Sequence, residues 1–134
     1  MLVPKLSFIA EGIIRDAVSN NISAFNILEG IAAQGFPFFF QHLNFFVLWE
    51  KELNDPDIYE GTLRIYNNSS PLIEDKYKID FLGKTRNRSI VNVNGLLIKE
   101  PGILKASITF DGVGAEYSVS INPMESAIKI QKTN

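Results

Sequence analysis

The sequence contains no cysteine and a single histidine, His42. Without cysteine the chain has no disulfide, no thiolate nucleophile and no cysteine-ligated zinc site. Serine triads and histidine-based metal sites normally need a histidine with partners, so one histidine also leaves little room for these chemistries. Because small secreted domains often depend on disulfides, the absence of cysteine indicates a cytoplasmic protein.

Long apolar runs and an excess of positive charge are also missing. The first residues lack the charged segment and long apolar segment of a signal peptide. The most apolar window, Phe36–Trp49, is interrupted by Gln41 and Asn44 and is shorter than the ~20 residues of a membrane-spanning helix. A formal net charge of −2 provides no positive field to attract nucleic acid or anionic lipid. We therefore expect neither nucleic acid nor a membrane as a partner.

The sequence is rich in apolar and polar residues that alternate with a period of two, which is typical of strands with one buried face. In the clearest unit, Leu104–Phe110 and Ala115–Ile121 both alternate. Asp111-Gly112 between them is a strong signal for a tight hairpin turn. The segments Thr62–Tyr66 and Lys76–Phe81 alternate in the same way.

Turn-forming residues divide the chain at intervals of about 8–12 residues, a spacing typical of β-sandwiches and barrels. Further strands are expected at Phe8–Ile14 and Ile22–Leu28, whereas Ile27–Ala33 has the composition of one helical turn. With 134 residues, 46% of them hydrophobic, the chain predicts one all-β domain over residues 1–122. Residues 123–134 are expected to form a C-terminal tail or an extra strand.

A broader pattern comprises Asn21–Gly30, then Phe36-Pro37 and Leu43–Val47, and a closing hairpin unit that opens with Glu100–Leu104. This pattern resembles a family of small bacterial and phage proteins catalogued only as a domain of unknown function, and it covers most of the chain. The resemblance implies an immunoglobulin-like antiparallel β-sandwich of about seven to nine strands, with no known activity. Many such domains place a tyrosine after this corner, where the chain has Leu104, so we expect apolar packing to hold the corner.

The run from Phe38 to Trp49 is apolar on both faces of the expected strand. Its core stripe consists of Leu43, Phe45, Val47 and Trp49. A strand with one solvent-exposed face should not also be apolar on the other side, so another part of the chain or a partner must cover that face. The candidate interface residues on it are Phe38, Phe40, His42, Phe46 and Leu48.

An acidic loop at Asn54–Asp57 suggests a weaker alternative, a calcium site formed by Asp55 and Asp57 with Asp111 from the distant hairpin turn. The competing interpretation is a solvated turn, because Asn, Asp and Pro form turns for local reasons. In a carbohydrate-binding version of this sandwich, the rings of Tyr59 and Tyr66 would stack on a sugar.

Three further groups of residues are weaker candidate sites. The loop residues Lys84, Arg86 and Arg88 offer weak candidates for binding an anion, although an ordinary polar connection fits the net negative charge better. Glu50 and Glu52 lie two apart, so on a strand they would share a face and could be the paired carboxylates of a hydrolase, although many surface strands have the same spacing. His42 is either a general base at the open end of a cleft or a packed strand residue.

The sequence therefore predicts a non-catalytic binding or assembly module with no cofactor. Its partner would be another protein or a second copy, held through a sheet face or a sheet edge. A calcium- or carbohydrate-binding sandwich is the alternative, and a carboxylate-dependent hydrolase is the weakest of the three hypotheses.

Overall fold

The structure, a computed structural model, describes residues 1–124. Within these residues the chain forms nine strands and no helix, which confirms the expected all-β class. The strands are β1 (Val3–Arg15), β2 (Ile22–Ile27), β3 (Gly30–Ala33), β4 (Phe38–Glu50), β5 (Ile58–Asn67), β6 (Ser70–Asp80), β7 (Arg86–Ile98), β8 (Gly102–Phe110) and β9 (Val113–Pro123). Accordingly, residues 1–124 contain no helix that is long and apolar enough to cross a membrane.

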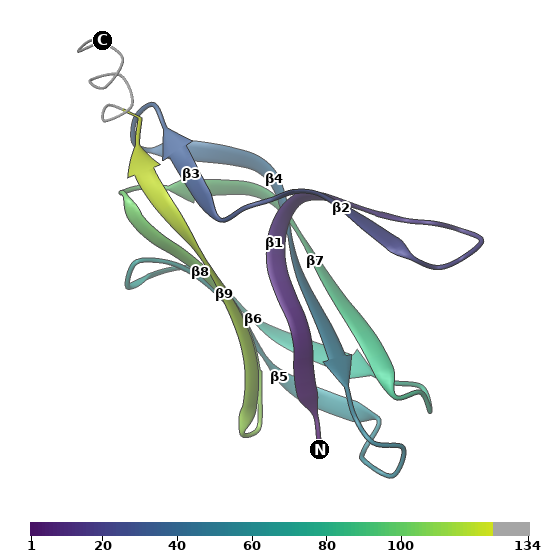
Figure 1. The fold of residues 1–134 in the computed structure, drawn as a ribbon. Helices are drawn as coiled ribbons and strands as arrows, with labels where there is room; N and C mark the ends of the chain where they lie inside the picture. Colours follow the sequence, from purple (N-terminus) through teal and green to yellow (C-terminus); the bar gives the residue numbers. More distant parts are fainter. Residues whose placement is uncertain (125–134) are drawn as a thin grey trace.

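Two sheets pack face to face as a sandwich (Figure 1). One sheet has the order β2-β1-β4-β7 and the other the order β3-β9-β8-β5-β6. All neighbouring strands are antiparallel except β3 and β9, which run parallel. The β4–β7 pair and the row β6-β5-β8-β9 correspond to the B–E pair and the C′-C-F-G row of immunoglobulin-like domains.

The core between the sheets is built from the period-two stripes that the sequence predicts. Leu104, Ala106 and Ile108 of β8 are fully buried, and β9 pairs with them along the expected hairpin. The turn between these strands has Gly112 at a φ of 74°, a left-handed conformation that glycine adopts without a steric penalty. The hairpin predicted from the sequence is thus confirmed.

The alternation on β4 changes phase once. Phe40 is buried in the main core and Phe38 packs against it, while the core stripe then continues at Leu43. The expectation that Phe38 and Phe40 lie on the face opposite Leu43 is therefore wrong. A period-two pattern assigns one face to all even positions and cannot reveal a change of phase within the strand.

The same three-residue step occurs on β7, between the buried residues Val93 and Leu96. Gly95 lies between them at a φ of 85°, and a Cβ placed there would lie 3.3 Å from the Phe39 ring. Glycine at this position therefore allows both strands to shift phase together while the pairing register stays unchanged.

The outer face at Phe46 is covered by the chain itself. Phe46 is 2% exposed and its ring stacks on that of Phe8, with the ring centroids 4.9 Å apart. Strand β1 pairs with β4 as far as Ala10 and from there pairs with β2, forming a hairpin that we call the arm, residues 10–27. Residues of the arm pack against Phe8 and Phe46, and Leu48 joins them. In Figure 1 the arm projects from the body of the sandwich.

One expected element differs from the structure. The stretch Ile27–Ala33 does not form a helical turn, because Gly30–Ala33 pairs with β9 as the edge strand β3. Strand β9 ends at Pro123, next to the expected end of the domain at residue 122. The expected tail or extra strand lies, from residue 125 onward, outside the described residues.

The corner before β8 uses buried Leu104 as expected, but two asparagines that the sequence reasoning missed add hydrogen bonds. The Asn67 amide, which is buried, donates to the carbonyls of Glu100 (3.2 Å) and Ile103 (3.4 Å). Its oxygen accepts from the backbone N–H groups of Lys99 and Glu100. Asn68 donates to Pro101 O at 3.0 Å. These amides satisfy backbone groups that a turn leaves unpaired.

Candidate functional site

Four strands form the edges of the two sheets, and they differ in how they are protected. Strands β2 and β3 are short, with six and four residues. Strand β6 carries Pro71, Lys76 and Lys78, the kinds of residue that discourage edge pairing. Strand β7 has 13 residues and none of these devices after Arg88, since Ser89–Ile98 contains neither charge nor proline. Long, uncharged edges of this kind are the ones that accept another strand.

The hydrogen-bond register identifies which backbone groups of β7 face the open edge. The N–H of Lys51 donates to Thr85 O at 2.9 Å, in line with the β4–β7 register. In an antiparallel ladder such bonds recur at every second residue, so the odd-numbered residues of β7 bond to β4. The even-numbered residues Ile90, Asn92 and Asn94 therefore point their N–H and C=O groups away from β4. No described strand pairs with that edge.

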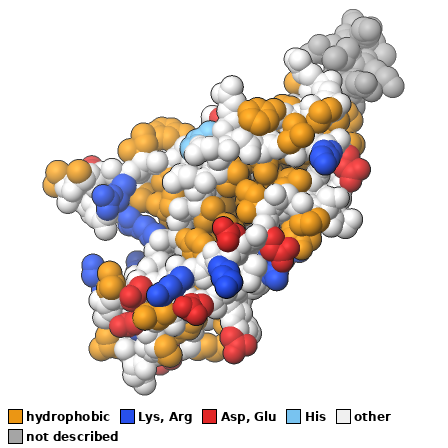
Figure 2. Space-filling view, turned by 180° about the vertical axis from the view of Figure 1, so that it is seen from behind, with side chains coloured by type: hydrophobic (Ala, Val, Ile, Leu, Met, Phe, Trp, Pro, Cys, Tyr) orange, Lys and Arg blue, Asp and Glu red, His pale blue; other side chains and the backbone are white. Residues whose placement is uncertain are grey.

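The side of the sandwich formed by β6 and β7 also has apolar side chains that are only partly covered. Three apolar side chains that pack against the core there stay half-buried, Ile73 and Tyr77 of β6 and Val91 of β7. Figure 2 views the molecule from the side of β5 and β6, the strands that are distant in Figure 1. Hydrophobic side chains occupy the middle of this view. A strand added to β7 would extend its sheet along this side.

The outer face beside this edge carries a row of polar side chains. His42 Nδ1 lies 2.7 Å from Asn94 Oδ1, and Asn44 Nδ2 lies 3.3 Å from His42 Nε2. Since an amide nitrogen donates, Nε2 accepts and Nδ1 carries the proton that is shared with Asn94. Both ring nitrogens of this exposed histidine are thus engaged, an arrangement that favours the packed strand residue over the general base.

The acidic loop is organised around a lysine. The Lys51 side chain is 0% exposed, and its ammonium lies 3.2 Å from Asp57 Oδ1. It also donates to the carbonyls of Glu52 and Asp55, each at 3.2 Å. Backbone carbonyls and a carboxylate are the ligands that calcium would use, and here the ammonium occupies them. Within residues 1–124 no three His, Asp or Glu side chains are grouped to hold a metal ion, so Asp111 does not join the loop.

The remaining carboxylate of this loop is also engaged. Asp55 accepts hydrogen bonds from the ammonium of Met1 and from the backbone N–H of Glu52, and these interactions lower the pKa of Asp55. Tyr59 packs its ring against Phe81 with the centroids 5.9 Å apart. Burial, with the nearby acidic charges, raises the pKa of Tyr59. Tyr59 is therefore part of the core packing rather than a platform for a sugar.

The basic residues do not converge on one point. Arg86 and Arg88 belong to β7 rather than to a loop, because the strand begins at Arg86. Arg86 Nε lies 3.1 Å from Glu50 Oε2, and an Arg88 guanidinium nitrogen donates to Asn20 O in the arm at 2.6 Å. Only Lys84 stays in the connection before β7. Two of the three anion-binding candidates are thus committed to contacts within the protein.

The two glutamates of the hydrolase hypothesis are separated by the end of a strand. Glu50 is the last residue of β4, and its carboxylate forms a salt bridge with Arg86. The Lys5 ammonium lies 3.9 Å from Glu50 Oε1. Glu52 follows in the loop, so the two carboxylates do not share a strand face.

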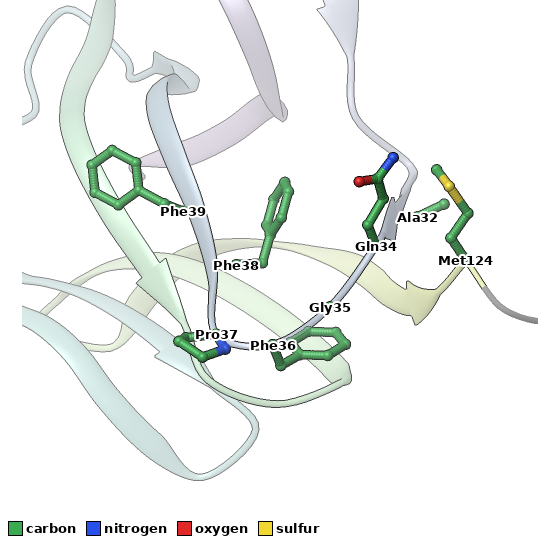
Figure 3. A pocket seen from close by; sticks show the side chains of 8 residues that line it. All are labelled: Ala32, Gln34, Gly35, Phe36, Pro37, Phe38, Phe39 and Met124. Atoms are coloured by element: carbon green, nitrogen blue, oxygen red, sulfur yellow. The ribbon is translucent and has the colours of Figure 1, made fainter.

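A shallow depression of about 580 Å³ lies where β9 ends and β4 begins (Figure 3). Its lining residues are Ala32, Gln34, Gly35, Phe36, Pro37, Phe38, Phe39 and Met124. Figure 3 shows the Phe38 and Phe39 side chains on opposite sides of β4, and Phe39 is 58% exposed. Among these described lining residues, Gln34 alone has a side chain that forms strong hydrogen bonds, whereas ligand sites usually have several converging polar groups.

Comparison with known proteins gives no match to a protein family, to a curated protein or to a solved structure.

Proposed function

We propose that this protein is a non-catalytic binding module that accepts an extended protein segment as an additional strand along β7. The observation that carries the proposal is the unpaired edge of β7, where Ser89–Ile98 runs for ten residues without charge or proline. In strand addition the main-chain hydrogen bonds supply affinity, and the flanking side chains supply specificity.

Two further features support this function. Apolar side chains on the β6–β7 side are half-buried, and an added strand would remove more of their surface from water. The lysines and the proline of β6 discourage pairing at that long edge, and Ser89–Ile98 of β7 contains no such residue. The cytoplasm remains our expected compartment, for the reason that the sequence has no cysteine.

The test uses one proline on each long edge. Asn92→Pro removes an N–H that points away from β4, so the fold should persist while strand addition is blocked. Lys78→Pro is the matched control, because Phe81 N bonds to Asp57 O and the even-numbered residues of β6 therefore face outward.

We expect any associated chain, a second copy or another protein, to be lost from Asn92→Pro and kept by Lys78→Pro. In the complex of the unmodified protein, the amides of Ile90, Asn92 and Asn94 should be protected from hydrogen exchange. The proposal is wrong if Asn92→Pro keeps its partner, if these amides stay unprotected in the complex, or if the chain associates with nothing.

A further inference from the structure

The two ends of β7 differ in charge, and its midpoint does not carry a charge. Asn92 lies halfway between Arg86 and Ile98, the first and last residues of the strand. The charged side chains are confined to the first three residues, and the other end consists of Leu96, Leu97 and Ile98. A strand with this composition can be opposed by a reversed copy of itself without placing like charges opposite each other.

We infer that the occupant of this edge is β7 of a second copy, paired antiparallel about a two-fold axis at Asn92; this inference rests on the proposed function. The outward-facing residues are even-numbered, so hydrogen-bonded pairs across the seam must join even-numbered residues. Centring the axis on Asn92 pairs the even-numbered residues from Ile90 to Asn94, which precede the change of phase at Gly95. It places Asn92 opposite Asn92 of the second copy and Ile90 opposite Asn94 of the second copy.

The charges permit this register. Leu96 and Ile98 lie after the change of phase at Gly95 and point into the core, so Arg86 and Arg88 lie outside the paired segment and oppose no charged residue of the second copy. Both arginines keep their present contacts with Glu50 and with the arm at their own ends of the strand. A two-fold interface of this kind is self-complementary and closes as a dimer, joining two four-stranded sheets into one sheet of eight.

The side chains at the seam match as well. Asn44 lies beside Asn92 across the β4–β7 ladder. The two-fold axis extends this row into four asparagines, Asn44 and Asn92 of one copy followed by Asn92 and Asn44 of the other. An amide carries both a donor and an acceptor, so an asparagine can pair with its own copy, which a charged residue cannot do. Ile90, which is 36% exposed, would lose solvent contact beside Asn94 of the second copy.

The absence of cysteine makes this register directly testable, because an introduced cysteine is the only thiol in the chain. Directly opposed residues of an antiparallel pair have Cα atoms about 5.5 Å apart, within reach of a disulfide. Asn92→Cys should therefore form a disulfide-linked dimer under mild oxidation. Asn94→Cys alone should not, since its two copies would be about 13 Å apart along the strands.

A mixture of Ile90→Cys and Asn94→Cys should give the mixed dimer, because these positions oppose each other. Lys78→Cys on the protected edge of β6 measures the yield from random collision. We expect at least a tenfold higher initial rate of cross-linking for Asn92→Cys than for Lys78→Cys. Light scattering over a range of concentrations should show a dimer for the unmodified chain and a monomer for Asn92→Pro.

Equal rates for Asn92→Cys and Lys78→Cys, or a monomer at every concentration, would overturn the second copy as occupant. If such a monomer nevertheless binds a different protein with protection of the Ile90, Asn92 and Asn94 amides, the proposed function stands and only this inference fails. If no complex protects those amides, both fail. A dimer that cross-links fastest through Asn94→Cys would overturn the register centred on Asn92.

Discussion

The two long sides of the sandwich differ in the contacts that close the space between the sheets. On one side β1 lies beside β9, and the hydroxyl of Ser7 donates to Glu116 O at 3.2 Å. The Tyr117 hydroxyl donates to Leu28 O at 2.8 Å, and β3 adds parallel pairing to the same strand. On the other side β6 and β7 approach each other where they are joined, with Asn87 donating to Asp80 O at 3.0 Å. The first side is closed by the chain itself, and the second keeps an edge that a partner can use.

This difference indicates that the open edge is a feature of β7 in particular and not of every edge strand in this small β protein. Strand β6 borders the same open side as β7, yet it has lysines and a proline, whereas β7 has neither and carries no charge after Arg88. Edge pairing is a hazard that sequences normally suppress, and of the two long edges only β7 lacks charge and proline over most of its length. The following predictions compare the two sides, beginning with the largest expected effect.

Truncating a core residue should lower the free energy of unfolding much more on the closed side than on the open side. Ile121 of β9 is 1% exposed, so Ile121→Ala should lower the free energy of unfolding by roughly 2–5 kcal/mol. Ile73 of β6 is only half-buried, and Ile73→Ala should cost on the order of 1 kcal/mol. Urea denaturation of dilute protein measures both values. Equal losses would mean that the open side is as well covered as the closed one.

Proline substitutions at two adjacent positions of β7 should differ in their effect on stability, because only one of them removes a backbone hydrogen bond to β4. Val91 is odd-numbered and bonds to β4, so Val91→Pro should reduce the free energy of unfolding by about 1–3 kcal/mol through an unpaired carbonyl. Asn92→Pro should be close to neutral in dilute protein, because its N–H faces the open edge. Thermal unfolding at low concentration compares them. The assigned register would be wrong if Asn92→Pro were the more damaging of the two.

Removing one hydroxyl should weaken the closed side slightly. Tyr117→Phe deletes the donor to Leu28 O and should cost about 1 kcal/mol. Tyr77→Phe is the matched control on the open side, where no hydroxyl bond among the described residues is lost. Chemical denaturation of both variants checks the difference. If Tyr77→Phe lost as much stability as Tyr117→Phe, the hydrogen bond to Leu28 would not explain the stability of the closed side.

The smallest effect concerns the tip of the arm. Asp16 accepts hydrogen bonds from the backbone N–H groups of Ser19 and Val18, which lower the pKa of its carboxyl. Because the folded state has the lower pKa, this contribution to stability is present above the unfolded value of about 3.9 and is lost as the pH falls through the folded pKa. NMR titration of the Asp16 carboxyl should show a midpoint below that value. A midpoint at the ordinary value would mean that the tip is open in solution.

The period-two patterns identified several strands correctly because burial on one face leaves a direct mark on composition. The Leu104–Ile121 hairpin followed from the alternation of its residues and from Asp111-Gly112. The acidic loop shows the limit of such reasoning. Asp55 and Asp57 appeared as free ligands, since nothing in their spacing indicated that the Lys51 ammonium would fold in among them.

The candidate site shows the same limit. Phe46 lies on a second apolar face, as predicted, but its cover is the arm and the ring of Phe8, a residue 38 positions earlier in the chain. The uncharged run Ser89–Ile98 was visible in the sequence and is the signal that would have drawn attention to β7. Whether such a run lies in the middle of a sheet or at its edge depends on the strand order.

By itself the sequence determined the all-β class, the turns and the faces of most strands, since alternation records which side chains are removed from water. Tertiary structure decided which strands are neighbours, and therefore which edge is left unpaired. Backbone hydrogen bonds between strands use the same N–H and C=O groups at every residue, so composition says little about which pairs form. The closed side, the change of phase at Gly95 and the open edge of β7 all follow from that pairing.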